Sequence, residues 1–351
     1  MKTVKNIVYL YSEVMPYAIA VMRALVEHFG VQVDCVYWDE KKRTPFVPQD
    51  EDGIYFHKRS AFDSTTLRKF IDERAPSAMY ISGRMDKLYL EMALHFKLKC
   101  KIVTGSDNQW VGSAKQKVAT VLSSVLYKKY FEYFWVPGPR QYEFARRMGY
   151  SNDKIIRNLL TADSRIFNNA YNDNLPLKKN SYPHNLVYAG RFAKTKGLDI
   201  LTDAFIAAKQ ETANDWKLTV IGSGEMAIAE HPSIVKRDFM SSEQLAADSR
   251  NWGGFCLPSA WEPWGVVIHE FTMAGLPMLC STGVGAADGL VVSGYNGYVF
   301  ETGSVAALRN AIVNLVSKSD AELLQMGERG HELSKMQSPT IAAYSLMSIL
   351  Q

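Results

Sequence analysis

The stretch that decides the fold is FCLPSAWEPWGVVIHEFTMAGLP, residues 255–277. It opens with an apolar run typical of a buried strand, passes through a polar loop, and takes helical spacing from near Pro263. The small residues of 274–277 end that helix, and a second apolar run follows at 278–280. The stretch predicts strand, loop, helix, turn and strand, which is the repeating unit of a parallel sheet covered by helices.

Two carboxylates stand out here, Glu262 beside the expected helix start and Glu270 about two turns further along. The N–H groups of a first helical turn bind anionic oxygens, and carboxylates accept hydrogen bonds from hydroxyl groups. The pair indicates a site for a ligand with phosphate and hydroxyl groups. The alternative is two solvated glutamates on a helix surface. We interpret the neighbouring His269 as packed or solvated rather than catalytic.

The same alternation extends in both directions and divides the chain into two domains. The second domain, predicted at 185–335, has strand-like runs at 186–189, 218–221, 255–257, 278–280 and 297–300. The first domain, predicted at 1–165, has strand-like runs at 7–11, 31–38, 78–82, 101–104 and 133–136, and helices at 16–28 and 64–74. Both domains are α/β, and we expect two doubly wound, Rossmann-like parallel sheets that face a central cleft.

Two segments lie outside these domains. Residues 166–184 are rich in Asn, Asp and Pro, which predicts a linker with turns. Residues 336–351 have the pattern of a terminal helix.

The composition of the 351 residues is that of an ordinary globular protein of two-domain length. No apolar run reaches the roughly 18–20 residues of a membrane-spanning helix, and no signal-peptide pattern is visible. The four cysteines are widely spaced, which favours thiols in a reducing compartment over a disulfide framework or metal site. We expect a cytoplasmic protein with no metal or other cofactor.

Charge is unevenly divided. Residues 1–165 contain 26 Lys and Arg against 18 Asp and Glu, a net +8, and the remaining 14 basic and 18 acidic residues give −4. The basic half predicts an anionic partner, such as peripheral association with an anionic membrane, or else a solvated basic face. Residues 115–131 are either an interfacial membrane helix or a helix whose apolar side is core. No nucleic-acid-binding motif accompanies the charge, so nucleic acid is not an expected partner.

Other loops after predicted strands add polar and small residues. The loop 190–197 places Arg191 and Lys196 between strand and helix, where two cations suit a diphosphate, although a basic surface loop is the alternative. Gly222 and Gly224 permit a tight turn and close backbone approach, but the full dinucleotide-binding pattern is missing. A further small-residue loop lies at 283–288.

The order of these motifs, Gly-Arg-x4-Lys-Gly, Gly-x-Gly, Pro-Ser-x2-Glu-x7-Glu and Ala-x-Gly-Leu-Pro, resembles the retaining family-four (group 1) glycosyltransferases of the GT-B fold. The resemblance covers residues 186–300, and the first domain is similar in architecture only. It implies that Arg191 and Lys196 hold the donor's diphosphate, that Glu270 binds ribose hydroxyls and that Glu262 binds the transferred sugar. Further implied donor-site residues are Gly190, Gly222, Gly224, Phe239, Met240, Trp264, Gly265, Val266 and Val267. In this fold the last helix commonly crosses back onto the first domain.

The chain departs from the family's pattern at three loops. The Gly-Gly loop after the first strand is replaced by 12–17, where Glu13 is an acceptor-side candidate. The place of a frequent histidine is taken by 105–108, where Asp107 either stabilises the sugar, positions the acceptor, or is a cap or turn residue. Asp288 stands near the place of a family glutamate. The acidic run 50–52 formally matches a metal–nucleotide pattern of another fold, and we interpret it as a solvated loop.

The resemblance implies a retaining, metal-independent glycosyltransferase that moves a sugar from a nucleotide-diphosphate sugar, such as a UDP- or GDP-sugar. The expected acceptor is a glycan or lipid-linked saccharide at the inner membrane face, in cell-surface polysaccharide synthesis. The expected catalytic residues are Glu262, Arg191, Lys196 and Asp107. One alternative is a sugar-nucleotide epimerase or hydrolase of similar fold, and another is a non-catalytic glycan-binding partner subunit.

Overall fold

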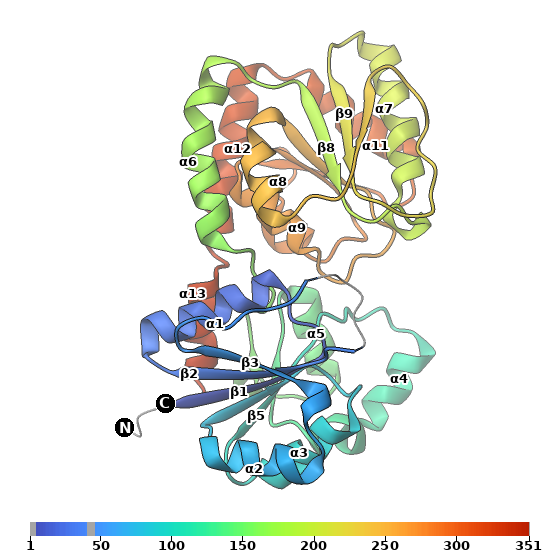
Figure 1. The fold of residues 1–351 in the computed structure, drawn as a ribbon. Coiled ribbons are helices and arrows are strands. Elements are labelled where there is room, and N and C mark those ends of the chain that lie inside the picture. The colour runs from blue at the N-terminus through green and yellow to red at the C-terminus, as the bar shows by residue number, and fades with distance from the viewer. Residues whose placement is uncertain (1–4, 41–45, 351) are drawn as a thin grey trace. The chain divides into compact units, whose positions relative to one another are not determined.

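The computed structural model describes residues 5–40 and 46–350, and the chain forms two compact units (Figure 1). The first unit comprises Met1–Thr161 and Gln337–Gln351, and the second comprises Ala162–Met336. The outermost residues of the predicted first domain and terminal helix, 1–4 and 351, lie outside the described residues, as does 41–45.

The described part of the first unit holds a parallel sheet with strand order β3-β2-β1-β4-β5-β6-β7. Its strands are β1 (Asn6–Tyr11), β2 (Gln32–Tyr37), β3 (Ile54–Lys58), β4 (Ala78–Ile81), β5 (Lys101–Gly105), β6 (Tyr133–Trp135) and β7 (Ile155–Ile156). Alternate residues of a strand face opposite sides of a sheet. Accordingly Ile7 and Tyr9 enter one buried cluster, while Val8 and Leu10 enter another on the opposite face.

Helices cover both faces of this sheet (Figure 1). The helices are α1 (Pro16–Phe29), α2 (Ser64–Arg74), α3 (Lys87–Phe96), α4 (Ala114–Val121), the π-helix η2 (Ser124–Lys128), α5 (Pro139–Arg147) and α13 (Pro339–Met347). Side chains of α1 and α13 share one buried cluster, and side chains of α2 and α3 share the other. The C-terminal helix therefore completes the core of the first unit.

The second unit repeats the arrangement, with strand order β10-β9-β8-β11-β12-β13. Its strands are β8 (Asn185–Ala189), β9 (Lys217–Ile221), β10 (Ile234–Arg237), β11 (Gly254–Leu257), β12 (Met278–Ser281) and β13 (Gly297–Phe300). In each sheet the strand order reverses beside the first strand, between β1 and β4 and between β8 and β11. Doubly wound sheets bind ligands at the carboxyl ends of strands near such a reversal.

The helices of the second unit are α6 (Ser164–Asn180), α7 (Leu198–Thr212), α8 (Ser242–Asp248), α9 (Val266–Met273), α10 (Ala287–Leu290), α11 (Val305–Val316) and α12 (Asp320–Ser334). Helix α7 packs against α11, and α12 packs against α9 and α6 (Figure 1). No helix of the described residues is long and apolar enough to cross a membrane.

The predicted linker at 166–184 is wrong, because most of it is helix α6. Asp163 caps this helix by accepting a hydrogen bond from the N–H of Arg165 at 3.1 Å. Phe167, Ala170 and Asn174 are buried at helical spacing, and the Asn174 amide donates to the Ser249 hydroxyl at 3.0 Å. Packing on the second unit thus overrides a polar composition that contains Pro176.

Three strands were missed by the pattern of apolar runs, namely β3, β7 and β10. Strands β3 and β10 lie at sheet edges, and most of their residues are exposed or half-buried. Strand β7 has only two residues. Edge strands with polar residues give neither a continuous apolar run nor clear alternation.

Candidate functional site

The second sheet brings the predicted motifs together at its carboxyl edge. The loop after β11 is hydrogen-bonded on one side to the loop after β8, where the N–H of Ala260 donates to the carbonyl of Thr195 at 2.8 Å. On the other side the N–H of Glu262 donates to the carbonyl of Gly283 at 3.0 Å, and the N–H of Gly285 donates to the carbonyl of Glu262 at 3.0 Å. Three loops from neighbouring strands are therefore fixed side by side.

The glycines of the loop after β9 fix a fourth loop in place. Gly222 and Gly224 have φ values of +138° and +154°. A Cβ on Gly222 would lie 2.0 Å from the carbonyl oxygen of Gly190, and one on Gly224 would lie 2.3 Å from that of Phe192. The close backbone approach expected at these glycines therefore brings the loop after β9 against the loop after β8. This contact holds in place the segment of the β8 loop that carries Arg191.

Lys196 and Glu262 form an ion pair across two of these loops, and each side chain is 17% exposed. Arg191 is exposed nearby in sequence, and its carbonyl accepts a hydrogen bond at 2.9 Å from the buried Tyr188 hydroxyl. The arrangement places one cation, Lys196, in contact with the Glu262 carboxylate and a second cation, Arg191, on the same short loop.

Helix α9 begins at Val266, three residues later than the start expected near Pro263. Its cap is Gly265, whose φ of +93° is a left-handed conformation that suits glycine. Val266 and Val267 form the first turn, where N–H groups have no intrahelical partner. Trp264 is buried, and its carbonyl accepts a hydrogen bond from the N–H of Ala286 at 2.9 Å. The first turn of α9 thus directly follows the loop that carries Glu262.

Glu270 lies one helix turn further into the unit and contacts a residue that the sequence did not reveal. The hydroxyl of Ser242 donates a hydrogen bond to Glu270 Oε1 at 3.1 Å. Burial raises the pKa of the Glu270 carboxyl to about 7, with the Ser242 hydrogen bond acting to lower it and the charge of Glu243 to raise it. Ser242 begins helix α8 directly after the segment with Phe239 and Met240, two of the donor-site residues that the family resemblance implies. Phe239 is 72% exposed, so its ring is accessible.

His269 is a structural residue. It is fully buried, its Nδ1 accepts a hydrogen bond from the N–H of Ala162 at 2.9 Å, and its Nε2 lies 3.0 Å from the carbonyl of Ser334. Both ring nitrogens are occupied by backbone groups, which confirms the interpretation that this histidine is packed.

The acceptor-side candidates lie in the first unit, at the carboxyl edge of its own sheet. Asp107 is exposed on the loop after β5, and Glu13 is half-buried on the loop after β1. Asp288, by contrast, is exposed on α10 of the second unit. Asp107 therefore belongs to a different unit from the other three predicted catalytic residues.

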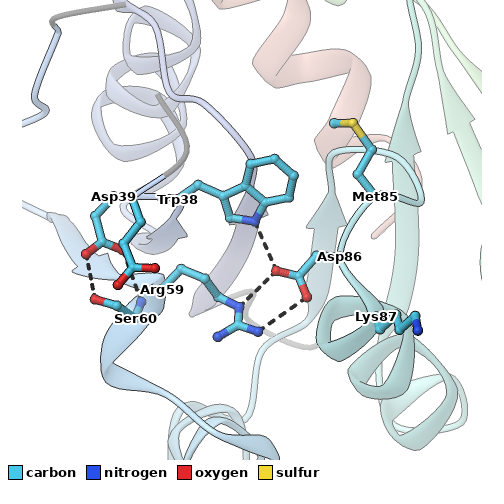
Figure 2. Close-up of a pocket in the computed structure, with 8 residues that line it drawn as sticks. Trp38, Asp39, Arg59, Ser60, Met85, Asp86 and Lys87 are labelled. Carbon is cyan, nitrogen blue, oxygen red and sulfur yellow. Dashed lines mark hydrogen bonds and ion pairs between the residues drawn. The ribbon is translucent and has the colours of Figure 1, made fainter. Parts of the chain in front are cut away.

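The first sheet also carries a pocket of about 400 Å³ that the sequence did not reveal (Figure 2). Its lining comes from the segments that follow three strands of this sheet, β2, β3 and β4, with β1 between β2 and β4: Trp38, Asp39, Glu40, Arg59, Ser60, Met85, Asp86 and Lys87. These residues share no sequence spacing, so no motif could have identified them. The signal available was their position directly after strands.

Asp86 organises this pocket, as Figure 2 shows. It accepts hydrogen bonds from Trp38 Nε1 at 3.0 Å and from Arg59 Nε at 2.9 Å. Burial acts to raise the pKa of Asp86, but the hydrogen bonds from Arg59 and Trp38 outweigh it and lower the pKa. Asp39 accepts two hydrogen bonds from Ser60, at 3.0 and 2.5 Å. The pocket thus combines a fixed indole ring with ionised carboxylates and a guanidinium.

The acidic run 50–52 contributes to structure. Arg23 forms an ion pair with Glu51 at 2.5 Å, and Asp50 accepts a hydrogen bond from the N–H of Phe56 at 2.7 Å. Within the described residues, no group of three or more His, Cys, Asp or Glu side chains gathers as metal ligands.

Part of the chain matches a known protein family. Residues 174–333, within the second unit, match the model of the family "Glycosyl transferases group 1". An uncharacterized glycosyltransferase of Methanocaldococcus jannaschii is 26% identical over 194 residues, 52% of this chain and 53% of the relative. The match thus spans about half the length of that curated relative.

Solved structures with the same fold cover nearly the whole chain. A glycosyltransferase from Rickettsia africae has a TM-score of 0.74 at 12% identity, over 99% of this chain and 97% of its own. Anabaena HepE in complex with UDP and glucose has a TM-score of 0.70 at 13% identity, over 99% of both chains. At such identities the likeness concerns the fold, which is GT-B, while the match to the group 1 glycosyltransferases concerns residues 174–333.

Proposed function

We propose that the chain is a retaining glycosyltransferase whose second unit binds a nucleotide-diphosphate sugar. The observation that carries this proposal is the Lys196–Glu262 ion pair at the β8–β11 reversal, bordered by Arg191 and the first turn of α9. Cations and N–H groups suit a diphosphate, and a carboxylate suits sugar hydroxyls. The HepE neighbour, solved with UDP and glucose, supports a donor of this class.

Each residue has a separate role in this proposal. Lys196 and Arg191 hold the diphosphate, Glu262 binds the sugar, and Glu270 binds the ribose hydroxyls. Phe239 and Met240 lie toward the base. When the donor binds, Lys196 exchanges part of its contact with Glu262 for the phosphate. Within the ion pair each charge compensates the other.

The transfer step follows from these positions. The bond between the anomeric carbon and the phosphate oxygen breaks, and its electron pair stays on the nucleoside diphosphate. The acceptor hydroxyl oxygen bonds to the anomeric carbon from the same face, and its proton passes to the departing phosphate oxygen. Lys196, Arg191 and the N–H groups of Val266 and Val267 stabilise the growing phosphate charge, at roughly 3–4 kcal/mol per well-placed donor. Two fixed cations support a reaction that does not depend on a metal ion.

The acceptor belongs to the first unit in this proposal. The pocket around Trp38 offers an aromatic face and carboxylates, which together suit the apolar face and hydroxyl groups of a saccharide. The pocket lies at the carboxyl ends of β2, β3 and β4, and Asp107 follows the carboxyl end of β5 in the same sheet. We propose a glycan or lipid-linked saccharide as the acceptor, in cell-surface polysaccharide synthesis. Four cysteines without disulfides support a cytoplasmic location.

Donor turnover tests the proposal. The chain is incubated with UDP-, GDP- and ADP-sugars, with and without saccharide acceptors, and the anomeric configuration of the product is read by NMR. We expect acceptor-dependent release of one nucleoside diphosphate with retained configuration, unchanged by EDTA. Arg191→Ala, Lys196→Ala and Glu262→Gln should each lower turnover about 100-fold or more.

Other outcomes separate the alternatives. A donor altered without any acceptor would indicate an epimerase or hydrolase. Binding of none of the nucleoside diphosphates would indicate a non-catalytic glycan-binding subunit. Activity that requires a divalent ion after EDTA treatment would contradict the metal-independent mechanism, and full activity of Arg191→Ala and Lys196→Ala would contradict the donor site.

A further inference from the structure

The helical stretch from α4 through η2 has two faces of opposite character. Toward the first unit, Ala119 and Tyr127 pack against the buried cluster around Phe134. The buried Ser123 hydroxyl on that side donates to the carbonyl of Met148 at 2.5 Å. The core interpretation of residues 115–131 is therefore correct for this face.

The other face presents an apolar stripe to solvent. Its members recur at positions i, i+3, i+4 and i+7, which lie on one side of a helix. They are Val118, Val121, Leu122 and Val125, with exposures of 58%, 80%, 46% and 59%. Aliphatic side chains gathered in an exposed stripe mark an interaction surface.

Lysines border the stripe at both ends. Lys115 lies about one turn before Val118 and Lys117 directly precedes it, while Lys128 and Lys129 follow Val125 by three and four residues; all four lysines are exposed. Between Asp107 and Glu132 the sequence has these four lysines and no acidic residue. Lys97, which follows the last residue of α3, adds a charge at the C-terminal end of the stripe, where its ammonium donates to the carbonyls of Lys128 and Lys129 at 3.0 and 2.9 Å.

We propose that the stripe and its lysine border form a docking surface for an anionic lipid bilayer. The aliphatic groups leave water for the boundary between headgroups and acyl chains, while the lysines lie at the level of the lipid phosphates. Charge selects this occupant over a second copy of the chain, because two such surfaces would bring eight of these lysines together. The surface belongs wholly to the first unit, so the inference is independent of the donor site.

The docking surface adjoins the acceptor-side edge of the first sheet. Helix α4 begins after the loop 106–113, which follows β5 and carries Asp107 and the 55% exposed Val111. A bilayer held by the stripe therefore lies next to the loops where we place the acceptor. In combination with the proposed function, this favours a lipid-linked saccharide over a soluble glycan.

Co-sedimentation with vesicles tests the surface. The full chain is mixed with vesicles of phosphatidylcholine alone and with vesicles of equal parts phosphatidylcholine and phosphatidylglycerol. We expect binding to the anionic vesicles only, weakening with added salt. Replacing Lys115, Lys117, Lys128 and Lys129 by Gln should reduce the partition coefficient at least about tenfold. Val118→Ser with Val121→Ser and Val125→Ser should reduce it by a similar factor.

The matched control replaces four exposed lysines elsewhere, Lys58, Lys69, Lys179 and Lys217, by Gln, which removes the same charge. This control should keep at least half of the binding, whereas equal loss in both lysine variants would show an effect of net charge and overturn the surface. Failure of the wild-type chain to bind anionic vesicles would also overturn the proposed surface.

A second outcome would reassign the stripe to a protein interface: dimers that form with rising protein concentration and that are lost in Val121→Ser. Nucleoside diphosphate binding, measured in parallel, should be unchanged in every variant and reports separately on the donor site.

Discussion

The two sheets share the order of their first six strands, yet their carboxyl edges are built differently. In the second unit, backbone hydrogen bonds and glycine contacts fix the loops, as where Gly222 packs on the carbonyl of Gly190. In the first unit, side chains fix the loops, as where Asp86 holds Trp38 and Arg59. A backbone-built edge suits one constant ligand, such as a nucleoside diphosphate. An edge built from side chains suits the more variable acceptor that we propose for the first unit.

The largest expected effect is on the free energy of unfolding, when one glycine at each edge is replaced by alanine. At Gly222 an added Cβ meets a carbonyl at 2.0 Å, whereas Gly83, after β4 with φ of +79°, has no atom within 4 Å of that position. Gly222→Ala should lower the free energy of unfolding by about 3 kcal/mol or more, and Gly83→Ala by about 1–2 kcal/mol. Denaturant unfolding measures both, and equal losses would remove the distinction between the edges.

The units also differ in how they bury charge. Asp34 of the first unit is buried beside His57 at 2.8 Å and Arg74 at 2.9 Å, whereas the buried Lys178 of the second has no hydrogen-bond partner among the described residues. Asp34→Asn should lower the free energy of unfolding by about 3 kcal/mol, because it leaves His57 and Arg74 without their charged partner.

Burial lowers the pKa of Lys178 to about 7. Lys178→Met should therefore raise the free energy of unfolding by about 1–4 kcal/mol.

The size of the Lys178 effect on stability depends on pH. A lysine with a lowered folded pKa binds its proton more weakly in the folded chain, so its destabilising contribution is greatest below about pH 7. That contribution fades as pH rises toward the unfolded value. Thermal melts across this range should show the gain of Lys178→Met shrinking as pH rises. A gain that grew with pH would contradict the buried-cation account.

The pH dependence of donor binding sharpens the assignment of Glu270. Its raised pKa of about 7 means that the carboxylate, the form that we propose accepts hydrogen bonds from both ribose hydroxyls, forms as pH rises through neutrality. Nucleoside diphosphate affinity should rise about tenfold between about pH 6 and pH 8 in the wild-type chain, and less in Glu270→Gln. Because the pKa of Glu270 in the folded chain, about 7, lies above the ordinary value of 4.5, the wild-type chain should lose stability relative to Glu270→Gln as pH rises from about 4.5 to about 7, with no further change above that.

The smallest expected effect concerns the first unit alone. Trp38→Ala should raise the KM for the acceptor about tenfold through the lost ring contact, with the KM for the donor unchanged. Trp38→Phe, which keeps a ring but loses the hydrogen bond to Asp86, should lie between wild type and Trp38→Ala. Steady-state kinetics with each substrate varied in turn separates the two values. A change in the KM for the donor alone would contradict the proposal that this pocket binds the acceptor.

The difference between the edges also explains what the sequence could predict. Loops that meet through the backbone need glycine and small residues at set positions, so the segments 190–197, 222–224 and 262–270 could be recognised as motifs. Ser242, which contacts Glu270, and the residues around Trp38 act through side chains from separate loops and leave no spacing pattern. Helix α6 was missed because its stability comes from packing on the second unit rather than from its composition.

Calorimetric titration of nucleoside diphosphates tests the central claim most directly, since it requires neither sugar nor acceptor. We predict that one of UDP, GDP and ADP binds at a single site, and that Arg191→Ala and Lys196→Ala each weaken its binding more than that of the matching monophosphate. Lys194→Ala, an exposed lysine on the same loop, should leave affinity within about twofold of wild type. Absence of binding by all three diphosphates, or affinities unchanged in both Arg191→Ala and Lys196→Ala, would contradict the donor site at the β8–β11 reversal.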